Sequence, residues 1–302
     1  MNRDPFSTLS RFLAATLFLL LLSAANNAMA ADMVDIECPD EVGIGQPFFV
    51  KISSRYPLDD LTVKWRGKTL KPQVEGEDYY YHSTLILGTD LRADAGEDTL
   101  EVSAVLWGHF RKFSKTLPIV PVKYQSETLS VPPKMVTPPQ EVLDRIAKEK
   151  ELIKAALATQ SPERYWTLPF SRPTKGIMLS RFGLYRVFNG EAKRRHTGLD
   201  FRAWKGTPLY SIAAGSVILT GHFYFAGNCA FIDHGNGLIS LYCHMSKLKV
   251  KEGDFVQAGQ TIGLSGATGR VTGAHLHLSV FANGEVIDPE PLVDNRIDGM
   301  IQ

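Results

Sequence analysis

Hydrophobic residues recur at every second position in several short runs within the first third of the chain. The clearest runs are FFVKISS (48–54), LTVKWRG (61–67) and LEVSAVLWG (100–108). Successive side chains of a β-strand point to opposite faces of a sheet, so this period indicates strands rather than helices. Turn residues separate the runs. We therefore predict a small antiparallel β-domain over residues 31–130, a sandwich of immunoglobulin-like type.

The next segment, residues 131–170, is predicted to be a linker that contains one helix. Its prolines mark the linker, and Thr137 with Gln140 forms a capping-box pattern in which Pro138 suits the first helical position. The apolar residues that would share one face of the helix are Val142, Ile146, Ile153 and Leu157.

The rest of the chain differs in composition, since 18 of the 25 glycines and six of the eight histidines follow residue 175. This asymmetry predicts a second domain, over residues 171–295, with a different role from the first. Without residues 1–30 the chain has 272 residues, which exceeds one average domain and favours two. The predicted fold class is mainly β, with a linker helix between the domains.

The N-terminus reads as a secretory signal. Arg3 and Arg11 precede an apolar run over residues 12–25, which is shorter than the ~20 residues needed to span a bilayer. The small-residue motif AMA at residues 28–30 predicts cleavage before Ala31. We expect an exported protein that is not membrane-bound after cleavage.

The charge of the mature chain is balanced. Removing residues 1–30 takes away two basic residues and one acidic residue, which leaves 31 of each. Nucleic-acid binding usually needs a concentrated positive charge, so nucleic acid is not an expected partner. Cys229 and Cys243 flank the HGNG turn at equal distances from Asn236, and a cross-strand disulfide between them is an open hypothesis beside two buried free thiols.

Two histidines near the end of the chain are separated by one residue, in the stretch GRVTGAHLHLSV (269–280). On a strand His275 and His277 would point the same way, with Leu276 on the opposite face. Upstream, His196 stands four residues before Asp200, and a bend at Gly198 would bring the two together. Each motif is weak by itself, because both occur by chance in many chains.

Three ligands drawn from these four residues, two imidazoles and one carboxylate, form a good set for Zn²⁺ and leave a fourth position for water. Such an ion makes hydroxide available at neutral pH, which predicts a hydrolase. The motif alone does not decide whether His275 or His277 is the ligand. His244, in SLYCHMS, is a further candidate acid or base. We interpret His234 as structural, His222 as non-catalytic, and His82 and His109 as ordinary surface or core histidines.

Five stretches of the second half resemble the lysostaphin-type zinc metallopeptidases of family M23. These stretches are LSRFG (179–183), HTGLDFRAWKGTPLYSIAAGSV (196–217), GNCAFIDHGNGLISLYCHMS (227–246), VKEGDFVQAGQTIGLSGATGRVTGAHLHLSV (250–280) and VIDPEPL (286–292). The resemblance implies a largely antiparallel β-domain with its site in a groove floored by a sheet. It also implies that Zn²⁺ is held by His196, Asp200 and His277, and that His244 and His275 are the unligated catalytic histidines.

The function that follows is a zinc-dependent endopeptidase that hydrolyses amide bonds in peptidoglycan cross-link peptides during cell-wall remodelling. The alternative is a catalytically inactive or weak wall-binding regulator of another murein hydrolase. We expect a periplasmic location, peptidoglycan peptides as the partner and a monomer. The sequence leaves open the scissile bond, the protein partners and the role of the N-terminal domain.

Overall fold

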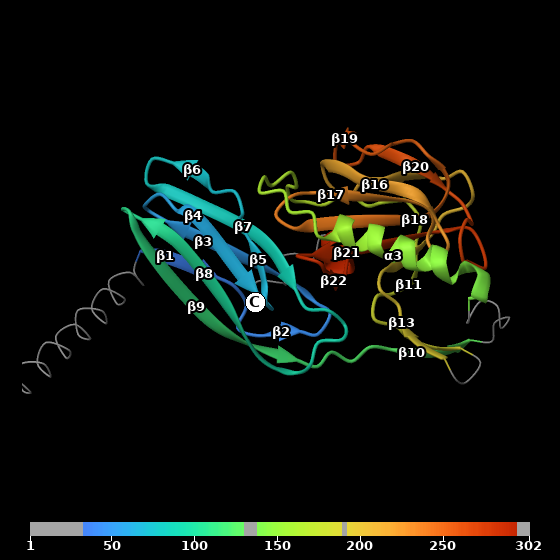
Figure 1. Cartoon of the computed structure of the whole chain (residues 1–302), viewed down its shortest axis with the longest axis horizontal. Helices are drawn as coiled ribbons and strands as arrows, with labels where there is room; N and C mark the ends of the chain where they lie inside the picture. The colour runs from blue at the N-terminus through green and yellow to red at the C-terminus, as the bar shows by residue number, and fades with distance from the viewer. Residues whose placement is uncertain (1–32, 130–137, 189–191, 295–302) are drawn as a thin grey trace, which may run out of the picture.

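The computed structural model describes residues 33–129, 138–188 and 192–294, and these residues form mainly β-strands (Figure 1). The predicted mainly β fold is confirmed. The predicted signal peptide lies outside the described residues, and so does Thr137 of the predicted capping box. Within the described ranges, no helix has the length and hydropathy needed to cross a membrane.

Residues 34–120 form two packed sheets. The first sheet has the order β1 (Val34–Glu37), β3 (Pro47–Ser54), β7 (Tyr80–Gly88) and β6 (Glu75–Glu77). The second has the order β2 (Val42–Gly43), β9 (His109–Val120), β8 (Gly96–Leu106), β4 (Asp59–Trp65) and β5 (Lys68–Leu70). The alternating apolar residues form the core of this sandwich, where Phe48 packs edge-to-face on Trp65. The immunoglobulin-like comparison stays a prediction, which these two strand orders support.

The second half is built on one large antiparallel sheet. Its main path is β11 (Met178–Ser180), β14 (Leu199–Arg202), β21 (His275–Ala282), β18 (Leu238–Leu248), β17 (Gly227–Asp233), β16 (Gly215–Phe223) and β19 (Phe255–Val256). Three more strands extend it: β15 (Pro208–Tyr210), β20 (Thr261–Ser265) and β22 (Glu285–Ile287), and the short helix α4 (Glu290–Val293) follows. Asp200 and the histidine pair of the sequence therefore lie on the neighbouring strands β14 and β21, and His196 lies in the segment that leads into β14.

A small third sheet joins the segment after the sandwich to the second half. It pairs β10 (Ser126–Leu129) in parallel with β12 (Tyr185–Phe188), which pairs in turn with β13 (Ala192–Arg195). Strand β13 ends directly before His196. The first strand that follows the sandwich thus reaches the edge of the candidate site.

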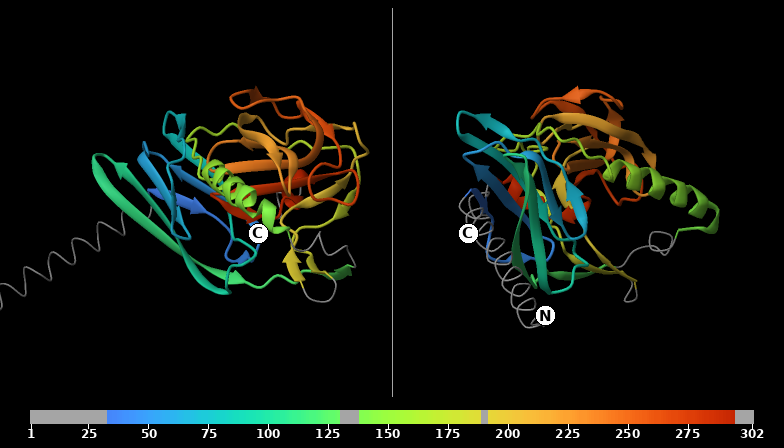
Figure 2. Two further views of the ribbon diagram at one scale, coloured as in Figure 1. Left: turned by 45° about the vertical axis from the view of Figure 1, so that its right-hand side comes forward. Right: turned by 60° about the vertical axis from the view of Figure 1, so that its left-hand side comes forward.

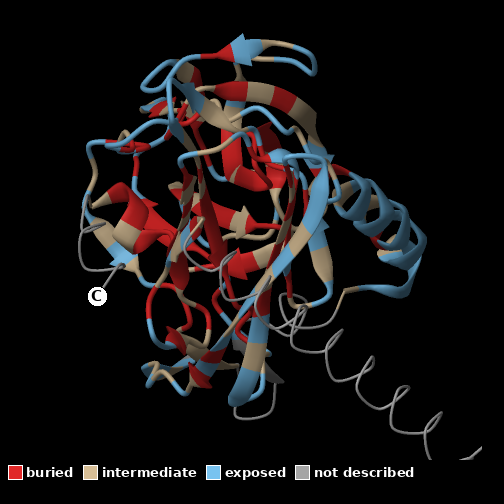
Figure 3. Ribbon diagram, turned by 90° about the vertical axis from the view of Figure 1, so that its left-hand side faces the viewer, coloured by how far each residue is buried: buried red, intermediate tan, exposed pale blue. Residues whose placement is uncertain are grey.

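The linker helix begins later than predicted. A 3₁₀ turn, η1 (Gln140–Val142), precedes helix α3 (Leu143–Leu157), and no side chain caps either start. The predicted apolar face is confirmed at three of its four residues, because Ile146 is buried and Ile153 and Leu157 pack against the sheet, whereas Val142 lies in the 3₁₀ turn before the helix. Figure 3 shows that most of the rest of α3 is exposed.

The two β-rich halves lie side by side and share buried contacts (Figure 2). Phe49 and Ile86 of the sandwich belong to the same apolar cluster as the core of the second half. Gly88 leaves room for Ile287, since a Cβ at that glycine would collide with the isoleucine side chain. This contact lies at the end of β21 opposite to its histidines, so the sandwich core supports the sheet at a distance from them.

The hypothesis of a disulfide between Cys229 and Cys243 is not supported. Both residues are buried free thiols in the same apolar cluster. Burial raises the pKa of Cys229 to about 12, so the thiol stays protonated and behaves as a small apolar side chain.

Candidate metal centre

Strands β14 and β21 place the candidate ligands in adjacent positions. Asp200 is directly opposite His277 in the antiparallel register. His275 and His277 point to the same face of β21, while Leu276 is fully buried in the core on the other face. The strand alternation predicted from the HLH motif is therefore confirmed.

The chain bends at Gly198, and this bend brings His196 back to Asp200. Glycine is required here because of space. A Cβ at this position would collide with the backbone carbonyl of Leu278 and the imidazole of His277. The backbone of the loop can therefore approach β21 closely only with glycine at this point.

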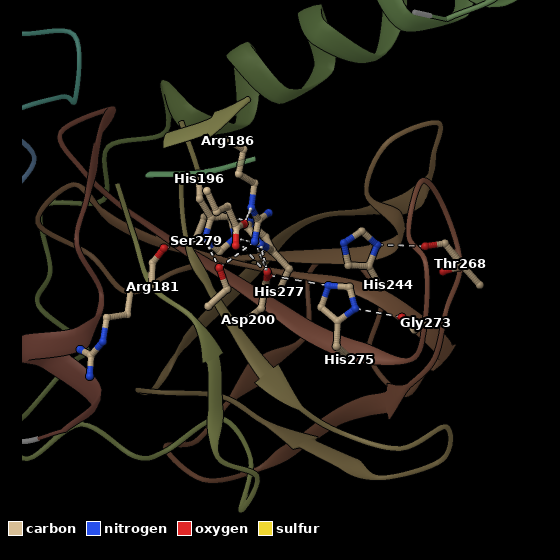
Figure 4. Close-up of polar contacts among 12 residues, drawn as sticks. Arg181, Arg186, His196, Asp200, His244, Thr268, Gly273, His275, His277 and Ser279 are labelled. Carbon is tan, nitrogen blue, oxygen red and sulfur yellow. Dashed lines mark hydrogen bonds and ion pairs between the residues drawn. The ribbon is translucent and has the colours of Figure 1, made fainter. Parts of the chain in front are cut away.

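Three ligand atoms converge at one point (Figure 4). Nε2 of His196 lies 3.0 Å from Oδ1 of Asp200 and 3.1 Å from Nδ1 of His277. Nδ1 of His277 lies 2.9 Å from Oδ1 of Asp200. In tetrahedral zinc sites with bonds of about 2.0–2.1 Å the ligand atoms are roughly 3.3 Å apart. The three atoms here are therefore slightly closer together than the ligand atoms of a bound zinc ion.

The hydrogen-bonding roles of these atoms favour a cation. Nδ1 of His196 donates to the backbone carbonyl of Arg181 at 2.8 Å, which leaves Nε2 with a lone pair in the neutral ring. Nε2 of His277 lies 2.9 Å from the hydroxyl of Ser279, and donation to that oxygen leaves a lone pair on Nδ1. Two nitrogen lone pairs and a carboxylate oxygen then face one another, and a bound metal ion would satisfy all three.

Ionisation of these groups agrees with a metal site. Burial opposes the charge of Asp200, but in the metal-free protein hydrogen bonds that place a proton between this carboxyl and His196 or His277 hold its pKa well below its usual value, and a bound metal ion would replace that proton. Burial lowers the pKa of His277, against the effect of Asp200. The result at neutral pH is a carboxylate beside a neutral imidazole, and both are in the form that binds metal.

His244 and His275 form a second pair beside the three convergent atoms. Their ring centroids are 4.9 Å apart. Nδ1 of His244 donates to the carbonyl of Thr268, and Nδ1 of His275 donates to that of Gly273, each at 2.9 Å (Figure 4). In the neutral form of each ring the lone pair is therefore on Nε2, which in His275 lies 3.7 Å from Oδ1 of Asp200.

His244 adopts an uncommon backbone conformation with φ of 64°. Its N–H donates to the carbonyl of Ala226 at 2.8 Å, which holds this geometry. Burial, with a smaller effect of His277, lowers the pKa of His244 to about 4, so the ring is neutral at physiological pH. Such strain at a residue beside a metal centre is typical of a functional position.

Comparison with known proteins identifies the family. The model of peptidase family M23 matches residues 194–289. A crystal structure of a Pseudomonas aeruginosa protein assigned to the M23 peptidases superposes with a TM-score of 0.59, at 31% sequence identity, covering 77% of this chain and 87% of that one. The chain belongs to peptidase family M23.

Two curated relatives match about a third of this chain. The peptidoglycan DD-endopeptidase ShyA of Vibrio cholerae is 46% identical over 93 residues, which are 31% of this chain and 22% of that protein. The DD-carboxypeptidase/endopeptidase Mpg of Neisseria meningitidis is 42% identical over 96 residues, which are 32% and 22%. The match therefore spans about a fifth of each curated relative.

The other histidines lie outside this M23 centre. His234 is fully buried, and His222 is exposed with its Nδ1 2.9 Å from the amide oxygen of Asn228. In the sandwich, His82 stacks on Tyr80 and lies 3.8 Å from Glu75, while His109 is exposed. The structure brings none of these four side chains to the convergent atoms.

Sequence reasoning missed the residues that surround the ligands. Ser279 stands two residues after His277 on the same strand face, so strand alternation contained the signal for it. Arg186 also reaches the centre, with its Nη2 3.3 Å from Oδ2 of Asp200 (Figure 4). No local pattern indicated Arg186, because its position depends on how the hairpin of β12 and β13 folds over the ligands.

Proposed function

We propose that this M23 protein is an exported, zinc-dependent endopeptidase that hydrolyses amide bonds in the cross-link peptides of peptidoglycan. The observation that carries the proposal is the convergence of two imidazole nitrogens and one carboxylate oxygen within 3.1 Å of one another. Three protein ligands with a free fourth position are the arrangement of a catalytic zinc site rather than a structural one.

The residues that would hold Zn²⁺ are His196 through Nε2, Asp200 through Oδ1 and His277 through Nδ1. When bound, zinc lowers the pKa of a water molecule toward ~7 and polarises a carbonyl group. The protein supplies neutral imidazoles in fixed tautomers. The carbonyl of Arg181 holds the tautomer of His196, and the hydroxyl of Ser279 does so for His277.

His275 and His244 would carry the proton transfers. Nε2 of His275 is close to the proposed ligand carboxylate and carries the lone pair of the neutral ring, so it can accept a proton from the attacking water. His244 presents a second unprotonated Nε2 at the neighbouring position. Either ring becomes a donor after it has accepted a proton, and can then stabilise a developing oxyanion or protonate the leaving amine.

The substrate class is taken from the relatives. Both curated relatives have names that specify cleavage of a DD-peptide bond, and ShyA is named a peptidoglycan enzyme. A periplasmic location follows from the predicted signal peptide and agrees with this substrate. We infer that the substrate is a peptide cross-link of the cell wall, and that the purified mature chain acts on it as a monomer.

The test is digestion of purified sacculi by the zinc-loaded mature chain, followed by mass analysis of the released muropeptides. Cleavage of cross-linked peptides should stop with a chelator, return with zinc, and be absent in His277→Ala. His222→Ala is the matched control and should keep full activity, because this exposed ring bonds to Asn228 and not to any proposed ligand or catalytic histidine. If the zinc-loaded wild type leaves cross-links intact but activates another murein hydrolase, the proposed peptidase function is wrong and the regulatory alternative is favoured.

A further inference from the structure

Arg186 contacts the carboxylate oxygen of Asp200 that does not take part in the contacts with His196 and His277. Asp200 directs Oδ1 toward His196 and His277, while its other oxygen, Oδ2, lies 3.3 Å from Nη2 of Arg186 (Figure 4). The two oxygens of one carboxylate therefore have separate partners. A guanidinium on Oδ2 keeps the carboxylate from rotating and leaves Oδ1 as the single ligand oxygen.

The same nitrogen also supports the region of a second ligand. Nη2 of Arg186 donates to the hydroxyl of Ser180 at 2.7 Å, and this hydroxyl lies 3.4 Å from Nδ1 of His196. Ser180 is opposite Asp200 in the register of β11 and β14. One guanidinium thus contacts two side chains, Ser180 and Asp200, that lie directly opposite each other on β11 and β14.

Arg186 is in turn held by the segment that follows the N-terminal sandwich. Its Nε donates to Oε1 of Glu127 at 2.8 Å. The two residues are directly opposite in the parallel pairing of β10 with β12, so the backbone register maintains this contact. The side chain of Arg186 is 23% exposed and that of Asp200 is 12% exposed, so water screens their attraction less than at an open surface.

We propose that Arg186 is a positioning residue that orients Asp200 for metal binding, and that Glu127 positions Arg186. Strand β10, in the segment that directly follows the sandwich, is then a part of the proposed metal centre and more than a connection between domains. The inference rests on the proposed zinc site. It adds a chain of contacts from Glu127 through Arg186 to Asp200. Glu127 and Arg186 both lie before residues 194–289, which match the M23 model, and outside the ligand motifs of the sequence.

The experiment measures zinc affinity of the full mature chain by competition with a chromophoric chelator. Arg186→Ala should weaken zinc binding about 10- to 100-fold, the usual effect of removing a partner that orients a ligand. Glu127→Gln should give a smaller loss, and should give no additional loss when Arg186 is already alanine. The zinc-dependent rise in melting temperature should shrink in the same order.

Arg164→Ala is the matched control. Arg164 makes two 2.8 Å contacts to the carboxylate of Glu75 and joins the two halves, but it does not contact a ligand. It should change the melting temperature of the metal-free chain and leave zinc affinity as in the wild type. If Arg186→Ala does not fold, Glu127→Gln still tests the proposal, because it keeps the guanidinium in the protein.

Two results would overturn the positioning role. One is wild-type zinc affinity in Arg186→Ala or, where that variant does not fold, in Glu127→Gln. The other is an equal loss from Glu127→Gln with and without Arg186, which would show that Glu127 acts independently. A wild-type chain that binds no zinc would overturn the proposed metal centre as well, so the two failures are distinguishable.

Discussion

The molecule contains two kinds of buried histidine, and they differ in how their ring nitrogens are satisfied. His234 is fully buried, its Nδ1 donates to the carbonyl of Ala214 at 2.8 Å, and its Nε2 lies 2.7 Å from the hydroxyl of Ser240. Each nitrogen has a complementary partner. At the candidate metal centre, in contrast, Nε2 of His196 and Nδ1 of His277 face each other and Asp200, so in the neutral rings acceptors meet acceptors.

This difference teaches that burial alone does not identify a functional histidine. Buried polar groups in native proteins are nearly always paired donor to acceptor, as at His234. A group of buried acceptors without donors is stable only when a cation or a proton joins them. The comparison predicts that changes at His234 lower stability more than activity, whereas changes at the candidate metal centre lower activity more than stability.

The largest effect is expected from Asp200→Asn. The amide keeps the shape of the side chain but removes the charge that would bind the metal. The activation barrier should rise by several kilocalories per mole, so activity on sacculi should fall roughly 10³-fold. The metal-free protein should be as stable as the wild type or more stable, because the NH₂ donor of asparagine replaces one of the acceptor oxygens of the carboxylate. A marked fall in the melting temperature of the metal-free variant would contradict the comparison.

His244→Ala and His275→Ala should each reduce kcat by roughly 10²-fold or more, since each removes a group that we propose transfers protons. Zinc content should remain that of the wild type, because neither ring is a proposed ligand. The checks are steady-state hydrolysis of a defined cross-linked muropeptide and metal analysis of the same samples. Loss of zinc from either variant would show that the ligand assignment is wrong.

His234 should make the free energy of unfolding depend on pH. Burial lowers the pKa of His234 from 6.5 to about 4, so between these values the unfolded chain binds a proton that the folded chain does not. The stability contribution of His234 is therefore complete above pH 6.5 and is lost as the pH falls toward 4, by about 3 kcal/mol in the free energy of unfolding.

Urea denaturation with a chelator present, repeated across this pH range, measures that loss. His234→Gln should show a shallower dependence of stability on pH than the wild type, by about the same 3 kcal/mol. Since other groups titrate in both proteins, the comparison uses the difference between the two curves. Parallel curves would show that His234 does not titrate in this range.

The smallest effects concern the two serines that contact histidines. Ser240→Ala leaves Nε2 of His234 buried without a donor and should lower the free energy of unfolding by about 1–3 kcal/mol. Ser279→Ala, at Nε2 of His277, should instead weaken zinc binding with less effect on the metal-free protein. Melting temperatures with and without zinc separate these outcomes, and equal patterns for both serines would remove the distinction.

Much of the fold and the ligand set could be predicted because it is encoded in local patterns. Alternation along Phe48, Val50 and Ile52 predicted strands, and alternation at His275 and His277 placed both rings on one face. The helix start was predicted wrongly, since a 3₁₀ turn over Gln140–Val142 replaces the expected first helical turn. The choice of His277 as ligand came from the resemblance to family M23, and it remains part of the proposal.

The sequence by itself determined the periodicity of the strands, the bend at Gly198 and the identity of the chemical groups, because these depend on residues close together in the chain. Only the tertiary structure decided that Glu127 reaches Arg186 and that Arg186 reaches Asp200, and which nitrogen of each histidine faces the centre. Those facts arise from pairing between distant strands and from hydrogen bonds to backbone carbonyls such as that of Arg181. Such contacts leave no repeat in the sequence, since the partners are far apart along the chain and any strand can supply a carbonyl.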